Sequence, residues 1–459
     1  MQSIRRLIAT LMFCVLFAAC APLGSGNSGG ATPTPGVTPT PTNSLLTPVT
    51  DISPLNCPPD MAGNPSCQTP RSLRVAYGVE SLMQRGYTGR GQTIVDIVSF
   101  GSPTLQQDMD IFDRQFDLPP ITIKVLSPLG AVPFNPNDRD MTGWAGETEL
   151  DVQIIHAIAP GANIVVLTSP VSETEGVIGL PQFLELEQYA IKNHLGTIIS
   201  QSWGASEVTL KDSTGQQQIQ QWDAFYKQAT TQQGITFFGS SGDNGATDYS
   251  DLKATILSTT PTSSFPTDDP WVTSTGGTTL QRVKSGTSFI ETAWNNGDGS
   301  RCAGVGNDSS GGGFSSFFPT PSYQQALPPV MQQELSHRRG VPDVSADADP
   351  CTGLAIYSGG WQLGGGTSAT APLWAAIMAI ANQMAGHALG FINPALYKLA
   401  LSSTYTQDFH DIVVGNNSVK VNGVLVQGYS AAPGWDPVTG LGSPNAEKLI
   451  PDLIAAIGP

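Results

Sequence analysis

The chain has 459 residues, enough for roughly one large domain or two to three ordinary ones. It contains 37 acidic and 21 basic residues, a formal net charge of −16, and only 13% of its residues are charged. Such an acidic chain is repelled by nucleic-acid phosphates and by anionic lipid headgroups, which excludes both as charge-driven partners. Apolar runs recur beyond the N-terminal region, so the chain is expected to fold around a sizeable core.

The first twenty residues read as an export signal. Arg5 and Arg6 precede an apolar run that ends in small residues before Cys20. The segment FAAC, residues 17–20, resembles a bacterial lipoprotein box, in which the cysteine is lipidated and becomes the mature N-terminus; a simple secretory signal is the alternative. No other apolar stretch is long enough to span a bilayer, so we predict membrane attachment only through a lipid on Cys20. The expected location is extracytoplasmic, as a cell-surface lipoprotein or a secreted protein.

Residues 21–53 are rich in Gly, Ser, Pro and Thr, a composition that does not bury enough apolar surface to fold. We interpret this segment as a tether. The remaining residues, 54–459, form the predicted folded domain, and no segment before it is long enough for a folded prodomain.

Four cysteines lie outside the signal: Cys57, Cys67, Cys302 and Cys351. An even number in an exported protein favours disulfides. Three connectivities are possible, and the short loop between Cys57 and Cys67 favours that pair together with Cys302–Cys351. No cysteine spacing indicates a zinc site.

From about residue 71, β-rich runs alternate with helical stretches. The runs 93–100, 163–169, 196–202 and 235–241 are predicted strands, and 147–158, 181–194 and 216–232 are predicted helices. This alternation is typical of a parallel sheet with helices on both faces. Ligands of such sheets bind at the carboxyl ends of the strands, where Ser202-Trp203-Gly204 and Ser241 to Gly245 (SGDNG) follow two of the runs.

A glycine-rich turn, GGGTSATAP, precedes the apolar stretch LWAAIMAIANQ and places Ser368 at the start of a predicted buried helix. Glycines allow close approach of a substrate, Pro372 is tolerated in a first helical turn, and free N–H groups there stabilise an oxyanion. An ordinary serine N-cap is the alternative. The string resembles the nucleophile segment of subtilisin-like and sedolisin-like peptidases.

Glu147 and Asp151 lie four residues apart in the predicted helix that Gly146 opens, so their carboxyl groups face the same way. An acidic, solvated face is the alternative. Apolar residues cover most directions around this helix, which indicates that at least one of the two acids is buried. A buried carboxyl pair has its pKa values pushed apart, as general acid and base catalysis requires.

The E-x-x-x-D pair, SGDNG and GTSATAP resemble the sedolisin family of serine-carboxyl peptidases, as do IISQSWG, RRGVPDVSADADP and GWDPVTGLGSPN. The resemblance runs from about residue 70 to the end and implies a subtilisin-like fold in a single large catalytic domain. It implies Ser368 as nucleophile, Glu147 as general base and Asp151 as the group that orients Glu147. Asp243 would stabilise the oxyanion, and Ser202, Trp203 and Gly204 would contact protein or peptide substrates.

The resemblance also implies a calcium site near the C-terminus. The matching residues are Asp411, Ile412, Ala432, Gly434 and Asp436, which offer two carboxylates and three backbone carbonyls to an ion that takes about six oxygens. Ala432 stands where the family usually has glycine. Two turn aspartates without an ion are the alternative.

The expected function is peptide-bond hydrolysis in acidic surroundings by a monomeric serine-type endopeptidase. Two other classes remain open: a histidine-type subtilisin, and an inactive peptide-binding surface lipoprotein. None of the five histidines lies in a His-Gly-Thr-His type segment, which disfavours the first. The presence together of Ser368, Glu147, Asp151 and Asp243 disfavours the second.

Overall fold

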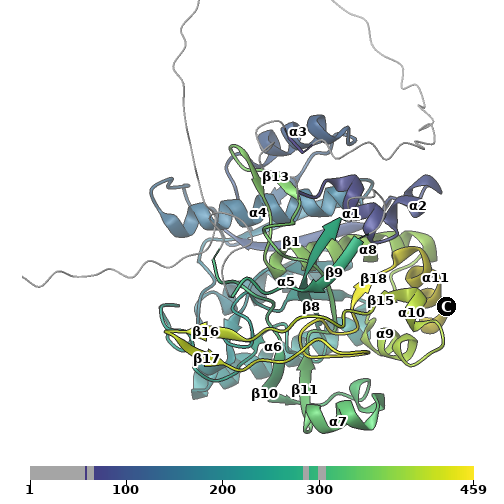
Figure 1. Ribbon diagram of the computed structural model, residues 1–459. Coiled ribbons are helices and arrows are strands. Elements are labelled where there is room, and N and C mark those ends of the chain that lie inside the picture. The colour runs from purple at the N-terminus through teal and green to yellow at the C-terminus, as the bar shows by residue number, and fades with distance from the viewer. Residues whose placement is uncertain (1–56, 59–66, 283–288, 298–305, 459) are drawn as a thin grey trace, which may run out of the picture.

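The computed structural model describes residues 57–58, 67–282, 289–297 and 306–458 (Figure 1). The predicted signal, Cys20 and the tether lie outside the described residues, as does Cys302. The structure joins Cys57 to Cys67 by a disulfide, as predicted. Cys351 is also disulfide-bonded. Within the described residues, no helix is long and apolar enough to cross a membrane.

An eight-stranded sheet forms the centre of the molecule, in the order β12-β8-β6-β4-β1-β3-β2 with β9 added beside β8. All neighbouring pairs along this order are parallel, and only β9 runs antiparallel. The strands are β1 (Thr93–Ser99), β2 (Lys124–Leu126), β3 (Asn163–Ser169), β4 (Ile198–Gln201), β6 (Thr236–Ser240), β8 (Thr273–Arg282), β9 (Phe289–Ala293) and β12 (Val344–Asp347). The predicted α/β class and parallel sheet are confirmed, and the four predicted strands correspond to β1, β3, β4 and β6.

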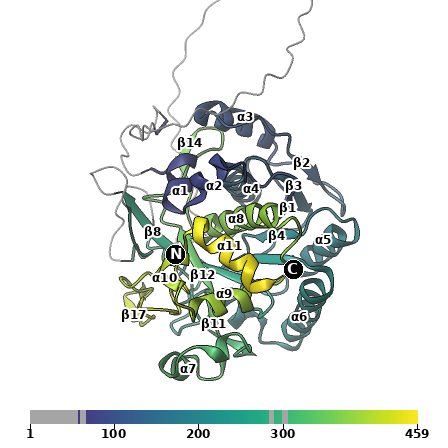
Figure 2. The ribbon, with the colours of Figure 1, turned by 90° about the vertical axis from the view of Figure 1, so that its right-hand side faces the viewer.

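Helices cover both faces of the sheet (Figure 2). On one face α4 (Arg139–Ile158) and α8 (Thr370–Ala385) pack with α11 (Ala446–Ile457) in the larger core cluster. On the other face α5 (Leu180–Lys192) and α6 (Ser213–Gln233) pack in the second cluster. Because both faces of the sheet are buried, its central strands read as nearly continuous apolar runs.

The remaining helices and strands lie outside the central sheet and its covering helices. The helices are α1 (Pro70–Ala76), α2 (Val79–Gln84), α3 (Leu105–Phe116), α7 (Pro329–Leu335), α9 (Asn393–Ala400) and α10 (Tyr405–Asp408), with 3-10 turns η2 (Glu207–Leu210), η3 (Gln324–Ala326) and η4 (Thr367–Ala369). The two-stranded pairs are β5 (Ala205–Ser206) with β7 (Ser264–Phe265), β10 (Gly313–Pro319) with β11 (Arg338–Val341), β13 (Ala355–Tyr357) with β14 (Trp361–Leu363), β15 (Phe409–His410) with β18 (Ser443–Pro444), and β16 (Val419–Val421) with β17 (Val424–Val426).

The helix that carries the carboxyl pair begins earlier than predicted. It starts at Arg139 rather than near Gly146, because the Asp138 side chain accepts hydrogen bonds from the backbone N–H groups of Asp140 and Met141 and caps it there. Glu147 therefore lies well inside α4, away from the free N–H groups of its first turn. The helix dipole at that end does not stabilise its charge.

Candidate active site

Ser368 lies in η4, a 3-10 turn directly before the buried helix α8. The preceding Gly366 has φ +86°, and a Cβ atom on it would lie 2.5 Å from Asp243 Oδ2. Both the left-handed backbone and the close approach therefore require glycine at this position. Ser368 itself is partly exposed, so its hydroxyl is accessible at the surface of an otherwise buried turn.

The hydroxyl of Ser368 lies within hydrogen-bonding reach of the carboxyl group of Glu147. One helical turn further along α4, Asp151 is fully buried, and its Oδ1 accepts a hydrogen bond from Ser202 Oγ at 2.8 Å. Glu147 Oε1 and Asp151 Oδ2 are both buried and receive no donor from the described residues. A neutral carboxyl group is buried at lower cost than a carboxylate, so this arrangement favours a protonated pair over two free carboxylates.

Burial governs the protonation of this pair. It raises the pKa of Glu147 to about 8, while the hydrogen bond from Ser368 acts in the opposite direction and Asp243 and Asp96 add to the rise. Burial also raises the pKa of Asp151 well above its usual range, with further contributions from Asp96 and Glu147. Once ionised, Glu147 is thus a stronger base than an ordinary carboxylate. Its neighbour Asp151 stays protonated in acidic solution, because the pKa of Asp151 is raised as well.

Asp243 follows β6 and is held against the nucleophile turn. Its Oδ1 accepts the backbone N–H of Thr367 at 2.7 Å and the Thr367 hydroxyl at 2.8 Å. Oδ1 is thereby occupied as an acceptor, which leaves Oδ2 as the oxygen to carry a proton. Burial raises the pKa of Asp243, although both Thr367 hydrogen bonds oppose that rise. The structure thus brings all four predicted catalytic residues into one cluster.

The segment after β4 contributes mainly through Ser202. Its hydroxyl lies 2.8 Å from Asp151 Oδ1 and 3.1 Å from the backbone oxygen of Ser368, so it lies between the two candidate catalytic elements. Trp203 is only 5% exposed and packs edge-on against Phe183 with ring centroids 4.8 Å apart. The backbone N–H of Gly204 donates to Glu173. A substrate-binding role for these three residues remains a prediction. The ring of Trp203 is buried, so it offers a substrate little surface.

Asp96 is a buried acid of this cluster that the sequence did not single out. It lies in β1, is 0% exposed, and its carboxyl group is within hydrogen-bonding reach of Asp151. Burial raises its pKa to about 7. The available sequence signal was one charged residue in the middle of the apolar strand TIVDIVS.

The histidines lie elsewhere. His156, on α4, is buried, and its Nε2 lies 2.8 Å from the Pro119 carbonyl oxygen and 3.3 Å from Asp113 Oδ1. The other four, His194, His337, His387 and His410, are exposed. The described contacts of Ser368 include no histidine, which disfavours a histidine-type subtilisin.

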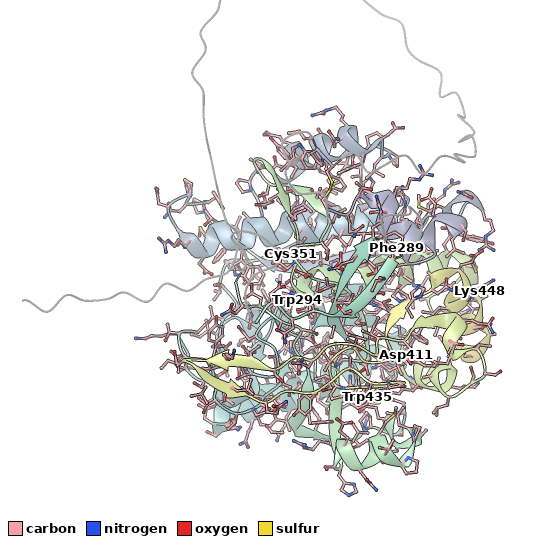
Figure 3. All side chains as sticks on the ribbon, viewed as in Figure 1. Phe289, Trp294, Cys351, Asp411, Trp435 and Lys448 are labelled. Atoms are coloured by element: carbon pink, nitrogen blue, oxygen red, sulfur yellow. A yellow bond between two sulfur atoms is a disulfide. The ribbon has the colours of Figure 1, made fainter. Side chains whose placement is uncertain are left out.

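The two aspartates of the predicted calcium site come from separate loops that meet beside Trp435 (Figure 3). Asp411 accepts the Gly434 N–H at 3.1 Å, and Asp436, 1% exposed, accepts the Ala432 N–H at 3.1 Å. Burial raises the pKa of the Tyr405 hydroxyl, and the negative charges of the two carboxyl groups raise it further.

The charges of this site have no cationic partner among the described residues, and burial raises the pKa of Asp436 to about 7. Ala432 does not have a positive φ, so its side chain does not obstruct a carbonyl ligand. In the ranges that the structure describes, no group of three or more His, Cys, Asp or Glu gathers as a metal site. Two carboxylates and three backbone carbonyls are oxygen ligands of the kind that calcium takes, and calcium binding here remains a prediction.

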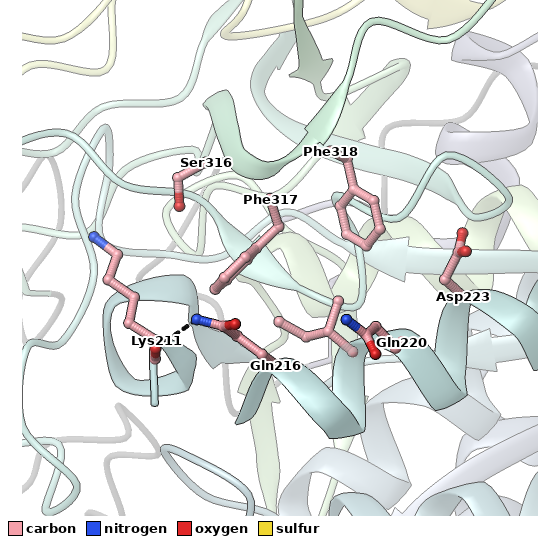
Figure 4. A pocket seen from close by; sticks show the side chains of 8 residues that line it. Lys211, Gln216, Gln220, Asp223, Ser316, Phe317 and Phe318 are labelled. Atoms are coloured by element: carbon pink, nitrogen blue, oxygen red, sulfur yellow. Dashed lines mark hydrogen bonds between the residues drawn. The ribbon is translucent and has the colours of Figure 1, made fainter. Parts of the chain in front are cut away.

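A separate open hollow of about 480 Å³ lies between α6 and β10 (Figure 4). None of the candidate catalytic residues lines it. Its walls are formed by Lys211, Gln216, Ile219, Gln220, Asp223, Ser316, Phe317 and Phe318.

Known proteins are similar to this chain in sequence and in fold, although no family model matches the chain. Kumamolisin of Bacillus sp. (strain MN-32) is 34% identical over 396 residues, which cover 85% of this chain and 64% of kumamolisin. Sedolisin of Pseudomonas sp. (strain 101) is 32% identical over 364 residues, or 78% of this chain and 57% of sedolisin. The chain thus spans somewhat less than two thirds of the length of these relatives.

The solved structure of Pseudomonas sedolisin, described as a serine-carboxyl proteinase complexed with two molecules of pseudo-iodotyrostatin, superposes with a TM-score of 0.68. The two are 27% identical, and the match covers 84% of this chain and 97% of that one. By sequence and by fold, the chain is similar to proteins of the sedolisin family.

Proposed function

We propose that this protein hydrolyses peptide bonds in acidic surroundings, with Ser368 as nucleophile, Glu147 and Asp151 as its activating carboxyl groups and Asp243 in the oxyanion hole. The observation that carries the proposal is that the Ser368 hydroxyl lies within hydrogen-bonding reach of the half-buried Glu147 carboxyl group. A serine hydroxyl is a weak nucleophile unless a base takes its proton. A half-buried carboxylate within reach of that proton is suited to do so.

In the first step Ser368 Oγ attacks the scissile carbonyl while its proton passes to Glu147. Asp151 supports Glu147 from the next turn of α4 and is itself held by Ser202. The negative charge that develops on the carbonyl oxygen needs donors, and a protonated Asp243 supplies one through Oδ2. Glu147 then gives its proton to the leaving amine, and water releases the acyl group by the same steps in reverse.

The rival that remains is a peptide-binding protein without activity, and digestion of an unfolded protein distinguishes the two. We expect the purified protein to cut an unfolded substrate internally in acid, and Ser368→Ala to leave it intact while keeping the wild-type thermal midpoint. Release of tripeptides alone would replace the endopeptidase assignment. A wild-type protein that binds the substrate without cutting it under acidic and neutral conditions would support the inactive class.

We also propose that calcium binds at Asp411 and Asp436 with the carbonyl oxygens of Ile412, Ala432 and Gly434. The ion would supply positive charge between two loops and would stabilise the folded state by mass action. The location outside the cytoplasm, the domain start near residue 54 and the lipid on Cys20 remain predictions.

Chelation of calcium is expected to lower the thermal midpoint of the wild-type protein by about 3–8 °C, since a ligand at 100 times its dissociation constant adds about 2.7 kcal/mol. Asp436→Ala should lose this response, whereas Asp110→Ala, on the exposed side of α3, should keep it. The readout is the midpoint in calorimetry with and without added calcium. Equal midpoints for wild type in both conditions would remove the ion from this proposal.

A further inference from the structure

The Asp96 side chain points from β1 toward α4, the helix that carries Glu147 and Asp151. Side chains alternate along a strand, and Ile94 and Val98, two residues before and after Asp96, both pack in the core cluster formed with α4 and α8. Val95 and Ile97 pack in the cluster on the opposite face. Asp96 therefore points to the face covered by α4, where its carboxyl group reaches that of Asp151.

We propose that Asp96 is a positioning residue of the peptidase, which shares one proton with Asp151 and thereby holds the Asp151 carboxyl group in place behind Glu147. Neither Asp96 oxygen has a donor among the described residues, and neither does Asp151 Oδ2. Carboxylates only accept hydrogen bonds, so a bond between the two groups requires one proton between them. This inference rests on the proposed function, because it assigns Asp96 to the same reaction.

The surroundings of the pair favour such a shared proton. From α4, Glu147 and Asp151 face Asp96, and both are acids. The sequence of α8 contains no charged residue. Beside Asp96 in the sheet lie Val166 of β3 and Ser200 of β4, which are uncharged. Among the described residues, no cation belongs to the groups that shift the pKa values of Asp96 and Asp151, so a second negative charge in the pair is unfavourable and the pair keeps its proton into the neutral range.

Asp151 is then held on two sides. Ser202 donates to its Oδ1, and the proton shared with Asp96 leaves little freedom for the rest of the carboxyl group. Its charge and orientation determine how strongly Glu147 attracts the Ser368 proton. Without Asp96, both Asp151 and Glu147 lose a neighbour that raises their pKa values. Glu147 would then be a weaker base that ionises at lower pH.

The test compares the full-length wild type with Asp96→Val and Asp96→Asn. Valine matches the apolar row of Ile94 and Val98, so the variant should fold. We expect kcat to fall about 10- to 100-fold with little change in KM, and the acid limb of the pH profile to move to lower pH. Asparagine still donates to Asp151 but does not share a proton, so it should recover part of kcat without restoring the acid limb.

A second readout does not depend on activity. The pKa of Asp96 is raised from 3.8 to about 7, so the folded state binds more protons than the unfolded state between these values, and stability falls as pH rises through this window. Asp96→Val removes that loss. Its thermal midpoint should exceed that of wild type by a larger margin near neutral pH than in acid.

The control is Glu187→Gln, which alters a buried acid on the opposite face of the sheet. It should change the pH dependence of stability while leaving kcat and the pH profile of hydrolysis unchanged. Wild-type kcat and an unmoved acid limb in Asp96→Val would overturn the inference, since a merely structural Asp96 changes only stability. If wild type does not hydrolyse peptides at all, the proposed function fails, and the stability readout alone decides whether Asp96 holds a shared proton.

Discussion

Ser368→Ala and Glu147→Ala are each expected to lower turnover by roughly 10⁴- to 10⁶-fold, and the double variant should lose about as much as either single one. The nucleophile and its base act as a unit in the proposed mechanism, because the proton that Glu147 takes from Ser368 is the one it later gives to the leaving amine. Once one member is absent, removing the other costs almost nothing further. The measurement is kcat in acid for wild type, both single variants and the double variant.

Glu185→Ala provides the matched control, because Glu185 is an exposed glutamate on α5. It should retain wild-type turnover. If the fold-loss in kcat of the double variant equals the product of the two single losses, Glu147 acts independently of Ser368. The role of Glu147 as the base for this serine would then be wrong.

The fold and the candidate residues Glu147, Asp151 and Ser368 were predictable, because the sequence patterns that indicate them are local. The spacing of Glu147 and Asp151 is a property of any α-helix, and the GGGTSATAP string carries both its turn and its serine. The parallel sheet followed from apolar runs whose burial on both faces removes any alternation. The start of α4 was not predictable from the apolar pattern, because Asp138 caps a first turn that is largely polar.

Asp96 was missed for a physical reason. Its role depends on the packing of β1 under α4, which joins residues 96 and 151 across the chain, and no short segment records that contact. Trp203 shows the same limit, since the sequence placed it after a strand but did not indicate that its ring packs against Phe183 and Trp222. Local patterns thus located the groups, and tertiary packing determines what each group faces.

Asp243→Asn is the variant that separates the oxyanion role from the rest of the site. In wild type, Asp243 donates to the oxyanion only while protonated, so its contribution is present below its pKa and is lost as pH rises through that pKa. Burial raises this pKa, which extends the active range upward from that of an ordinary carboxyl group. The carboxyl cluster of Glu147 and Asp151 must have lost a proton before Glu147 accepts that of Ser368, so activity also falls as pH drops and the cluster becomes fully protonated. The two requirements together predict a bell-shaped profile.

Asparagine keeps the contacts of Asp243 but does not ionise. Its amide oxygen takes the place of Oδ1 as acceptor for Thr367, and its NH₂ group takes the place of the protonated Oδ2. An amide is a poorer donor than a carboxyl group, so kcat/KM in acid should fall by up to about 10²-fold, less than the 10²–10³ that removal of an oxyanion donor costs. The decline toward neutrality should be flatter than in wild type, because one of the ionisations that causes it is gone.

The expected result is therefore a ratio: kcat/KM in acid divided by kcat/KM at neutral pH should be smaller for Asp243→Asn than for wild type. Asp117→Asn is the matched control, an exposed residue at the end of α3 whose left-handed backbone asparagine also tolerates. It should reproduce the wild-type profile. Full activity of Asp243→Asn in acid, or a wild-type maximum at alkaline pH, would mean that no proton on Asp243 serves the oxyanion. A loss in acid with the wild-type slope toward neutrality would assign that slope to the carboxyl pair of α4 instead.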